Sequence, residues 1–178
     1  MANEFTPILN RLPHSIHRID PTVTILRKYK LLLWSATVIL VRHAERAAGA
    51  NPALSATGQA RANLLRDMVQ DEDLSAVFVT DTLRSQQTGQ PAANAQGLAP
   101  TTYPATDGAA LAQTIRIGHA GRTVLVVAHS NTVDDIAGAL GAPGIGELAD
   151  SQFDRMFVIA RNWCGTRLTR LRYGAPTA

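Results

Sequence analysis

The chain is poor in cysteine, in aromatic residues and in charge. Its 178 residues include one cysteine, Cys164, which excludes an internal disulfide and any zinc site built on two or more thiolates. Aromatic side chains make up 5% of the residues, so the stacking surfaces used by many nucleic-acid-binding proteins are scarce. No apolar run is long enough to span a bilayer. These absences predict no nucleic-acid partner and no stable membrane span.

Apolar residues, by contrast, are abundant. The composition is 46% hydrophobic and 17% charged, with a net charge of +3, which excludes a disordered chain. At this length the sequence can form one domain with a sizeable core.

Residues 1–36 differ from the rest of the chain. They show no clear periodicity and are interrupted by Pro7, Pro13 and Pro21. Basic residues at 27–30 followed by apolar residues at 31–36 resemble a signal peptide, although the apolar stretch is shorter than the roughly 7–15 residues that such a peptide needs. We therefore expect a disordered or signal-like N-terminal extension over 1–36 and a catalytic domain over 37–178. The expected location is cytoplasmic, with export as the alternative if residues near 27–36 act as a signal.

Apolar runs alternate with helical patterns from residue 37 onward. Strands are expected at 37–41, 76–79, 101–103, 123–128, 153–160 and 166–173, and helices at 55–69, 83–95, 107–118 and 133–140. The first helix is expected to bury an apolar stripe of Ala60, Leu64, Leu65, Met68 and Val69. This alternation predicts a three-layer α/β/α sandwich whose central sheet is mostly parallel with an antiparallel C-terminal ending.

Two histidines stand where two of these strands end. His43 follows the first strand, directly after Arg42, and His129 follows the strand at 123–128. Ligands of open α/β sheets bind outside the carboxyl ends of the strands, so the two histidines can meet at one site.

A second arginine joins this group. Arg84 lies at the start of the helix after the second strand, where a guanidinium and a helix N-terminus together suit a phosphate group. Two arginines and two histidines would form a pocket for a phosphoryl dianion. The alternative is that Arg84 only bonds Asp81 on a solvated helix.

The motifs that contain these residues resemble those of the histidine phosphatase superfamily, in its phosphoglycerate-mutase-like branch. The four motifs, which cover about residues 37–140, are Val41-Arg42-His43-Ala44-Glu45, Leu54-Ser55-Ala56-Thr57-Gly58-Gln59-Ala60, the segment from Asp81 to Thr88, and Val127-Ala128-His129-Ser130-Asn131.

The resemblance implies a role for each pocket residue. His43 is the expected nucleophile, and Arg42, Arg84 and His129 are expected to hold the phosphoryl oxygens. The residues support this independently, because imidazole attacks phosphorus only when neutral and nearby guanidinium groups disfavour its protonated form. Asn131 either caps the following helix or offers its amide to phosphate. No metal or other cofactor is expected.

The general acid that protonates the leaving group has no clear match in the motifs. Asp107, just after the third strand, is the first candidate, with an ordinary helix cap as its alternative role. Glu45 is close to the nucleophile in sequence, but it can instead orient its neighbours.

The length of the domain favours hydrolysis over mutase chemistry. The 142 residues from 37 to 178 leave little chain for a lid that would keep water from a phosphohistidine. We therefore predict a compact phosphatase, similar to the small phosphohistidine phosphatases, that acts on a phosphorylated small molecule or a phosphoprotein. Phosphoglycerate-mutase-type transfer and a non-catalytic phosphate-binding module remain the alternatives.

Overall fold

A computed structural model describes residues 35–177 of the chain. The strands are β1 (Ala36–Arg42), β2 (Leu74–Val79), β3 (Thr101–Thr102), β4 (Thr123–Ala128), β5 (Arg155–Asn162) and β6 (Gly165–Arg172). The helices are α2 (Ala56–Val69), α3 (Leu83–Ala95), α4 (Gly108–Gly118) and α5 (Val133–Ala139). The N-terminal extension expected over 1–36 lies outside the described residues except for its last two.

The six strands form one mixed sheet in the order β3-β2-β4-β1-β5-β6. The pairs β1–β4, β2–β4 and β2–β3 are parallel, whereas β5 runs antiparallel to both β1 and β6. The predicted parallel sheet with an antiparallel ending is therefore confirmed. Because β1 and β4 are parallel neighbours, the residues that follow them leave the sheet at the same edge.

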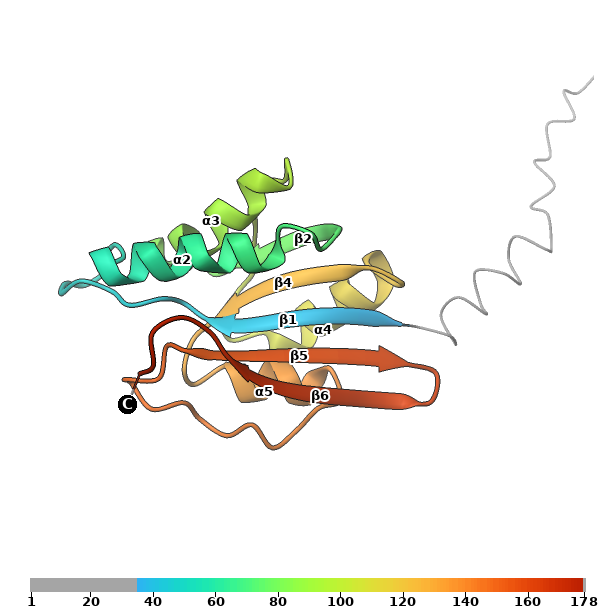
Figure 1. Ribbon diagram of the computed structural model, residues 1–178. Helices are drawn as coiled ribbons and strands as arrows, with labels where there is room; N and C mark the ends of the chain where they lie inside the picture. Colours follow the sequence, from blue (N-terminus) through green and yellow to red (C-terminus); the bar gives the residue numbers. More distant parts are fainter. Residues whose placement is uncertain (1–34, 178) are drawn as a thin grey trace, which may run out of the picture.

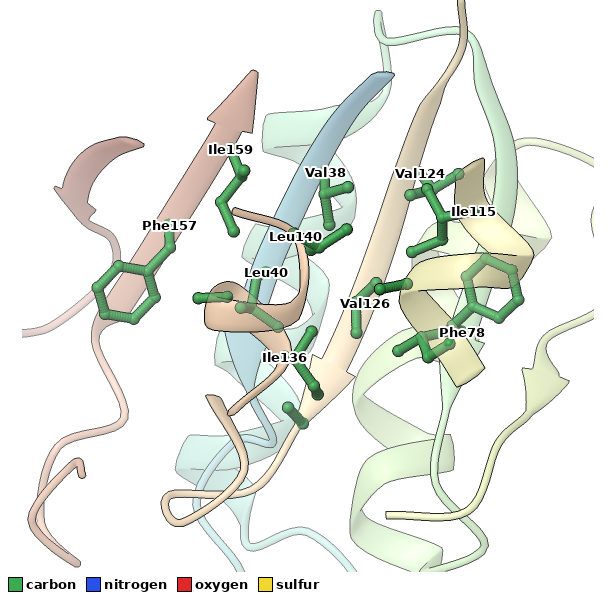
Figure 2. Close-up of a cluster of buried hydrophobic side chains, with 14 of the residues drawn as sticks. Val38, Leu40, Phe78, Ile115, Val124, Val126, Ile136, Leu140, Phe157 and Ile159 are labelled. Atoms are coloured by element: carbon green, nitrogen blue, oxygen red, sulfur yellow. The ribbon is translucent and has the colours of Figure 1, made fainter. Parts of the chain in front are cut away.

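Helices cover both faces of the sheet, as Figure 1 shows, with α2 and α3 on one face and α4 and α5 on the other. Successive side chains of β1 point to opposite faces of the sheet, so alternate residues pack against the two helical layers. Val38 and Leu40 pack in the cluster that includes Ile136 of α5 (Figure 2), while Ile39 and Val41 pack in the opposite cluster with α2 and α3.

The helix α3 lies unusually close to the sheet. A side-chain carbon added at Gly89 would lie 2.7 Å from Val79 Cγ1 and 3.1 Å from Val77 Cγ1, so glycine is required for this approach. In the first turn of α3, the Ser85 hydroxyl accepts from Thr80 N–H at 3.0 Å and donates to Val127 O at 3.2 Å, which ties this turn to the ends of β2 and β4.

The predicted apolar stripe of α2 is wrong in three of its five positions. Leu65 and Val69 are buried, but Ala60, Leu64 and Met68 are exposed. Arg61 is buried in the stripe instead, because its charge is paired within the fold, as described below.

The described helices are all too short or too polar to cross a membrane.

Candidate active site

The two histidines at the strand ends lie side by side. His43 and His129 follow β1 and β4, and their ring centroids are 5.3 Å apart in an edge-to-face arrangement. The His43 backbone N–H donates to Ala128 O at 2.9 Å, which extends the β1–β4 pairing to the residue before His129. The proximity expected from the strand ends is present in the structure.

Two hydrogen bonds define the tautomer of His43. Arg84 Nε–H donates to His43 Nε2 at 3.1 Å, so Nε2 carries the lone pair. His43 Nδ1 therefore carries the proton and donates to Ala44 O at 2.8 Å. Burial, together with the charges of Arg42, His129 and Arg84, lowers the pKa of His43 to about 3 despite the opposing Ala44 hydrogen bond. At neutral pH this imidazole is uncharged, with its lone pair on Nε2.

Arg42 is buried at the base of the site. Its Nη1 donates to the carbonyl oxygens of Ala149, Asp150 and Gln152 at 2.8, 3.0 and 3.3 Å. The guanidinium also lies over the Phe153 ring, 4.2 Å from the centroid. Its Nε has no hydrogen-bond partner among the described residues. The loop before β5 thus fixes one edge of the guanidinium.

Arg84 is the second residue of α3. The sequence predicted that Arg84 either contributes to the phosphate pocket or only bonds Asp81. In the structure its Nε donates to His43 and not to Asp81, so Arg84 contacts the site. The same helix is tied to the nucleophile's turn through Thr88, whose hydroxyl donates to Arg84 O at 2.8 Å and accepts from Ala44 N–H at 3.0 Å.

His129 is positioned by three threonines. Its Nε2 lies 3.0 Å from Thr80 Oγ1, which lies 3.1 Å from Thr82 Oγ1. Its backbone N–H donates to Thr132 Oγ1 at 3.0 Å. Burial, then the charges of Arg84 and Arg42, lower the pKa of His129, with Asp81 opposing. The sequence analysis did not identify these threonines, because a hydroxyl contact between separate loops has no sequence pattern.

The remaining candidates have different surroundings. Asn131 is exposed, and the N-cap position of α5 is held by Thr132, whose side chain makes no capping hydrogen bond, so the predicted capping role of Asn131 is wrong. Asp107 is also exposed and occupies the N-cap of α4, where its Oδ1 accepts from Ala110 N–H at 2.9 Å.

Glu45 is held in an ion pair that the sequence analysis missed. Both carboxylate oxygens accept from Arg61, at 2.7 to 3.0 Å, and Arg61 also donates to Tyr173 O and Ala175 O at 2.6 and 2.9 Å. Burial disfavours the charge, yet the Arg61 hydrogen bonds hold the pKa of Glu45 below its ordinary value. Gly58 lets α2 approach the backbone of Glu45 closely, because a Cβ at Gly58 would lie 2.0 Å from Glu45 O. The pairing with Arg61 favours the second of the two predicted roles of Glu45, in which it orients its neighbours.

Over residues 35–177, no three side chains of histidine, cysteine, aspartate or glutamate gather in a way that could hold a metal ion. Cys164, the single cysteine of the sequence, is exposed as a free thiol.

Comparison with known families supports the resemblance stated from the motifs. Residues 38–107 match the histidine phosphatase superfamily (branch 1). The matched span includes Arg42, His43 and Arg84 and ends before His129. A search of the curated proteins finds no match to this chain.

Solved structures of phosphatases have the same fold. The protein histidine phosphatase SixA, complexed with tungstate, is 18% identical with a TM-score of 0.61, covering 76% of this chain and 96% of its own. A mycobacterial glucosyl-3-phosphoglycerate phosphatase is 11% identical with a TM-score of 0.59, covering 80% and 100%. A phosphoserine phosphatase mutant from Entamoeba histolytica, bound to phosphoserine, is 13% identical with a TM-score of 0.57, covering 77% and 96%. These structures confirm the predicted fold.

Proposed function

We propose that this histidine-phosphatase-like chain hydrolyses phosphate monoesters or phosphoramidates through a phosphohistidine formed on His43, without a metal ion. The observation that carries the proposal is the lone pair on His43 Nε2, fixed by the Nδ1–H bond to Ala44 O and surrounded by Arg42, Arg84 and His129. A neutral, oriented imidazole among cationic donors suits attack on a phosphoryl dianion.

The reaction has two displacement steps. In the first, the Nε2 lone pair of His43 forms an N–P bond while the bond from phosphorus to the leaving oxygen or nitrogen breaks, and the leaving atom keeps the electron pair. Arg42, Arg84 and His129 hold the phosphoryl oxygens, with the Asn131 amide as a further donor. In the second step, water attacks phosphorus, the N–P bond breaks, and inorganic phosphate leaves.

Protonation of the leaving group is assigned to Asp107, which lies at the N-terminus of α4 beyond β3. The assignment rests on the position of β3 beside β2 in the sheet, since its end faces the same edge as those of β1 and β4. A phosphoramidate with a heterocyclic leaving group needs this proton less than an alkyl ester does.

The substrate classes follow from the site and from the similar proteins. SixA is named as a protein histidine phosphatase, and the other two neighbours are named for small phosphorylated molecules. We infer a phosphorylated small molecule or a phosphoprotein as substrate for this chain. The described residues that form the site all belong to the proposed catalytic domain over 37–178.

The proposed mechanism is tested by replacing the nucleophile. His43→Ala should lower the hydrolysis of an aryl phosphate, measured with a chelator present, at least about 10³-fold. Quenching the unmodified protein with alkaline denaturant during turnover of labelled substrate should trap a phosphoryl group that is stable in alkali and lost in acid, as a phosphoramidate is.

The matched control is His119→Gln, which removes a histidine beyond the C-terminus of α4 that bonds Ser75. It should retain activity and the trapped phosphoryl group. Near-normal turnover by folded His43→Ala, or a trapped label that persists in it, contradicts the covalent mechanism.

A further inference from the structure

Arg46, three residues after the nucleophile, has no role in the mechanism above. Its backbone forms a β-bridge with Leu54, and the adjacent Ala47 N–H donates to Ala53 O at 2.9 Å. The side chain of Arg46 is exposed, although the backbone beneath it is held in place.

The loop that carries Arg46 is also fixed to α3. Leu54 N–H donates to Gln87 Oε1 at 2.8 Å, and Leu83 N–H donates to Asn51 Oδ1 at 3.1 Å. Because Arg84 belongs to the same helix, the backbones of Arg46 and Arg84 are held in a defined relation to each other.

The charge of Arg46, which follows Arg42 and His43 in the chain, acts on both arginines assigned to the phosphoryl group. After burial, its charge has the largest effect on Arg84 and lowers the pKa of that guanidinium, and it also lowers the pKa of Arg42. No carboxylate in the described part of the chain lies within ion-pair distance of Arg46. Three neighbouring cations repel one another, and this repulsion is relieved when anions bind between them.

Two exposed carboxylates, in the loop after β2 and in the loop before β5, also act on the residues of the site. Asp81 acts on Arg84 and His129, and Asp150 acts on Arg42, to which it is paired at 3.5 Å. An anion bound near either carboxylate is repelled, whereas an anion near Arg46 meets an unpaired guanidinium. The positive and negative charges that act on the site therefore come from different segments of the chain.

We propose that Arg46 binds a second negative charge carried by the leaving group of the substrate, so that the preferred substrates are phosphorylated molecules with another anionic group close to the phosphoryl group. This assignment rests on the proposed function. Arg42, Arg84 and His129 bind the phosphoryl oxygens common to every substrate, while Arg46 distinguishes among leaving groups.

The test uses two aryl phosphates of the same shape. 3-Carboxyphenyl phosphate carries the second charge, and 3-carbamoylphenyl phosphate is its neutral counterpart. The protein should show at least about a tenfold higher kcat/KM for the carboxylate, since a guanidinium–carboxylate pair is charge-assisted. Arg46→Gln should reduce the ratio of the two kcat/KM values at least about tenfold, and Arg46→Lys, which keeps the charge, should retain part of it.

Arg122→Gln is the matched control. Arg122 is an exposed arginine directly before β4, at the end of the sheet opposite to His129, so its removal changes the net charge equally but should leave the ratio unchanged. Equal kcat/KM for the two substrates, or a preference that persists in Arg46→Gln, overturns the assignment. Failure of the proposed function gives a different result, in which His43→Ala hydrolyses both esters normally.

Discussion

Replacing Arg61 with methionine tests the ion pair beside the nucleophile. Methionine keeps an unbranched apolar side chain on α2 but removes the guanidinium, whose side chain is 3% exposed. The change leaves the Glu45 carboxylate, 16% exposed, without its cation and deprives Tyr173 O and Ala175 O of their donor.

The expected loss of stability is large. Removing one partner of a buried ion pair lowers the free energy of unfolding by about 3–5 kcal/mol. Because Glu45 is partly exposed, we expect a loss of about 3 kcal/mol for Arg61→Met. For a domain of this size, that loss lowers Tm by about 10 °C. Urea unfolding and thermal denaturation followed by circular dichroism measure both quantities.

Arg66 on the same helix provides the control. Its side chain is 41% exposed and bonds its exposed neighbour Asp67, so Arg66→Met should leave Tm unchanged. In a double-mutant cycle, Glu45→Gln combined with Arg61→Met should be less destabilising than the sum of the two changes. A loss below about 1 kcal/mol for Arg61→Met, or strict additivity in the cycle, refutes a stabilising role for the pair.

Two further predictions concern the chemistry. Arg84→Lys should lower kcat/KM for an aryl phosphate about 10- to 100-fold, because an ammonium cannot reproduce the planar donor geometry of a guanidinium, and equal efficiency places Arg84 outside the phosphoryl contacts. Asp107→Asn should spare an activated aryl ester and slow an alkyl phosphate about 10²-fold or more, because only the alkyl leaving group needs a proton. If neither ester slows, Asp107 serves only as the cap of α4.

The sequence was informative wherever a pattern is local. The bounds of α3 and β4 were predicted correctly. The strand is one uninterrupted apolar run, and the helix keeps its predicted bounds although Gly89 and Pro91 lie within it. The proximity of His43 and His129 followed from strand ends alone. Arg84 was likewise predicted from its place in the first turn of a helix.

Contacts between distant segments could not be predicted in this way. Arg42 bonds carbonyl oxygens more than one hundred residues away, in a loop whose backbone shape leaves no mark in the sequence. Arg61 was not among the residues predicted to be buried on its helix, yet it is buried and its acceptors come from Glu45 and from the C-terminal segment. The start of β5 was expected at Phe153, but the strand begins at Arg155, and Phe153 instead packs against Arg42.

The hydrogen bond from Arg84 to His43 imposes an order on the reaction. It uses the same lone pair on Nε2 that attacks phosphorus in the proposed mechanism, so the bond and the attack exclude each other. A phosphoryl group that draws the Arg84 guanidinium onto its own oxygens frees this lone pair as it binds. Binding of the phosphoryl group and release of the His43 lone pair then occur together. A compound without an anionic group for Arg84 would leave this lone pair hydrogen-bonded and unable to attack.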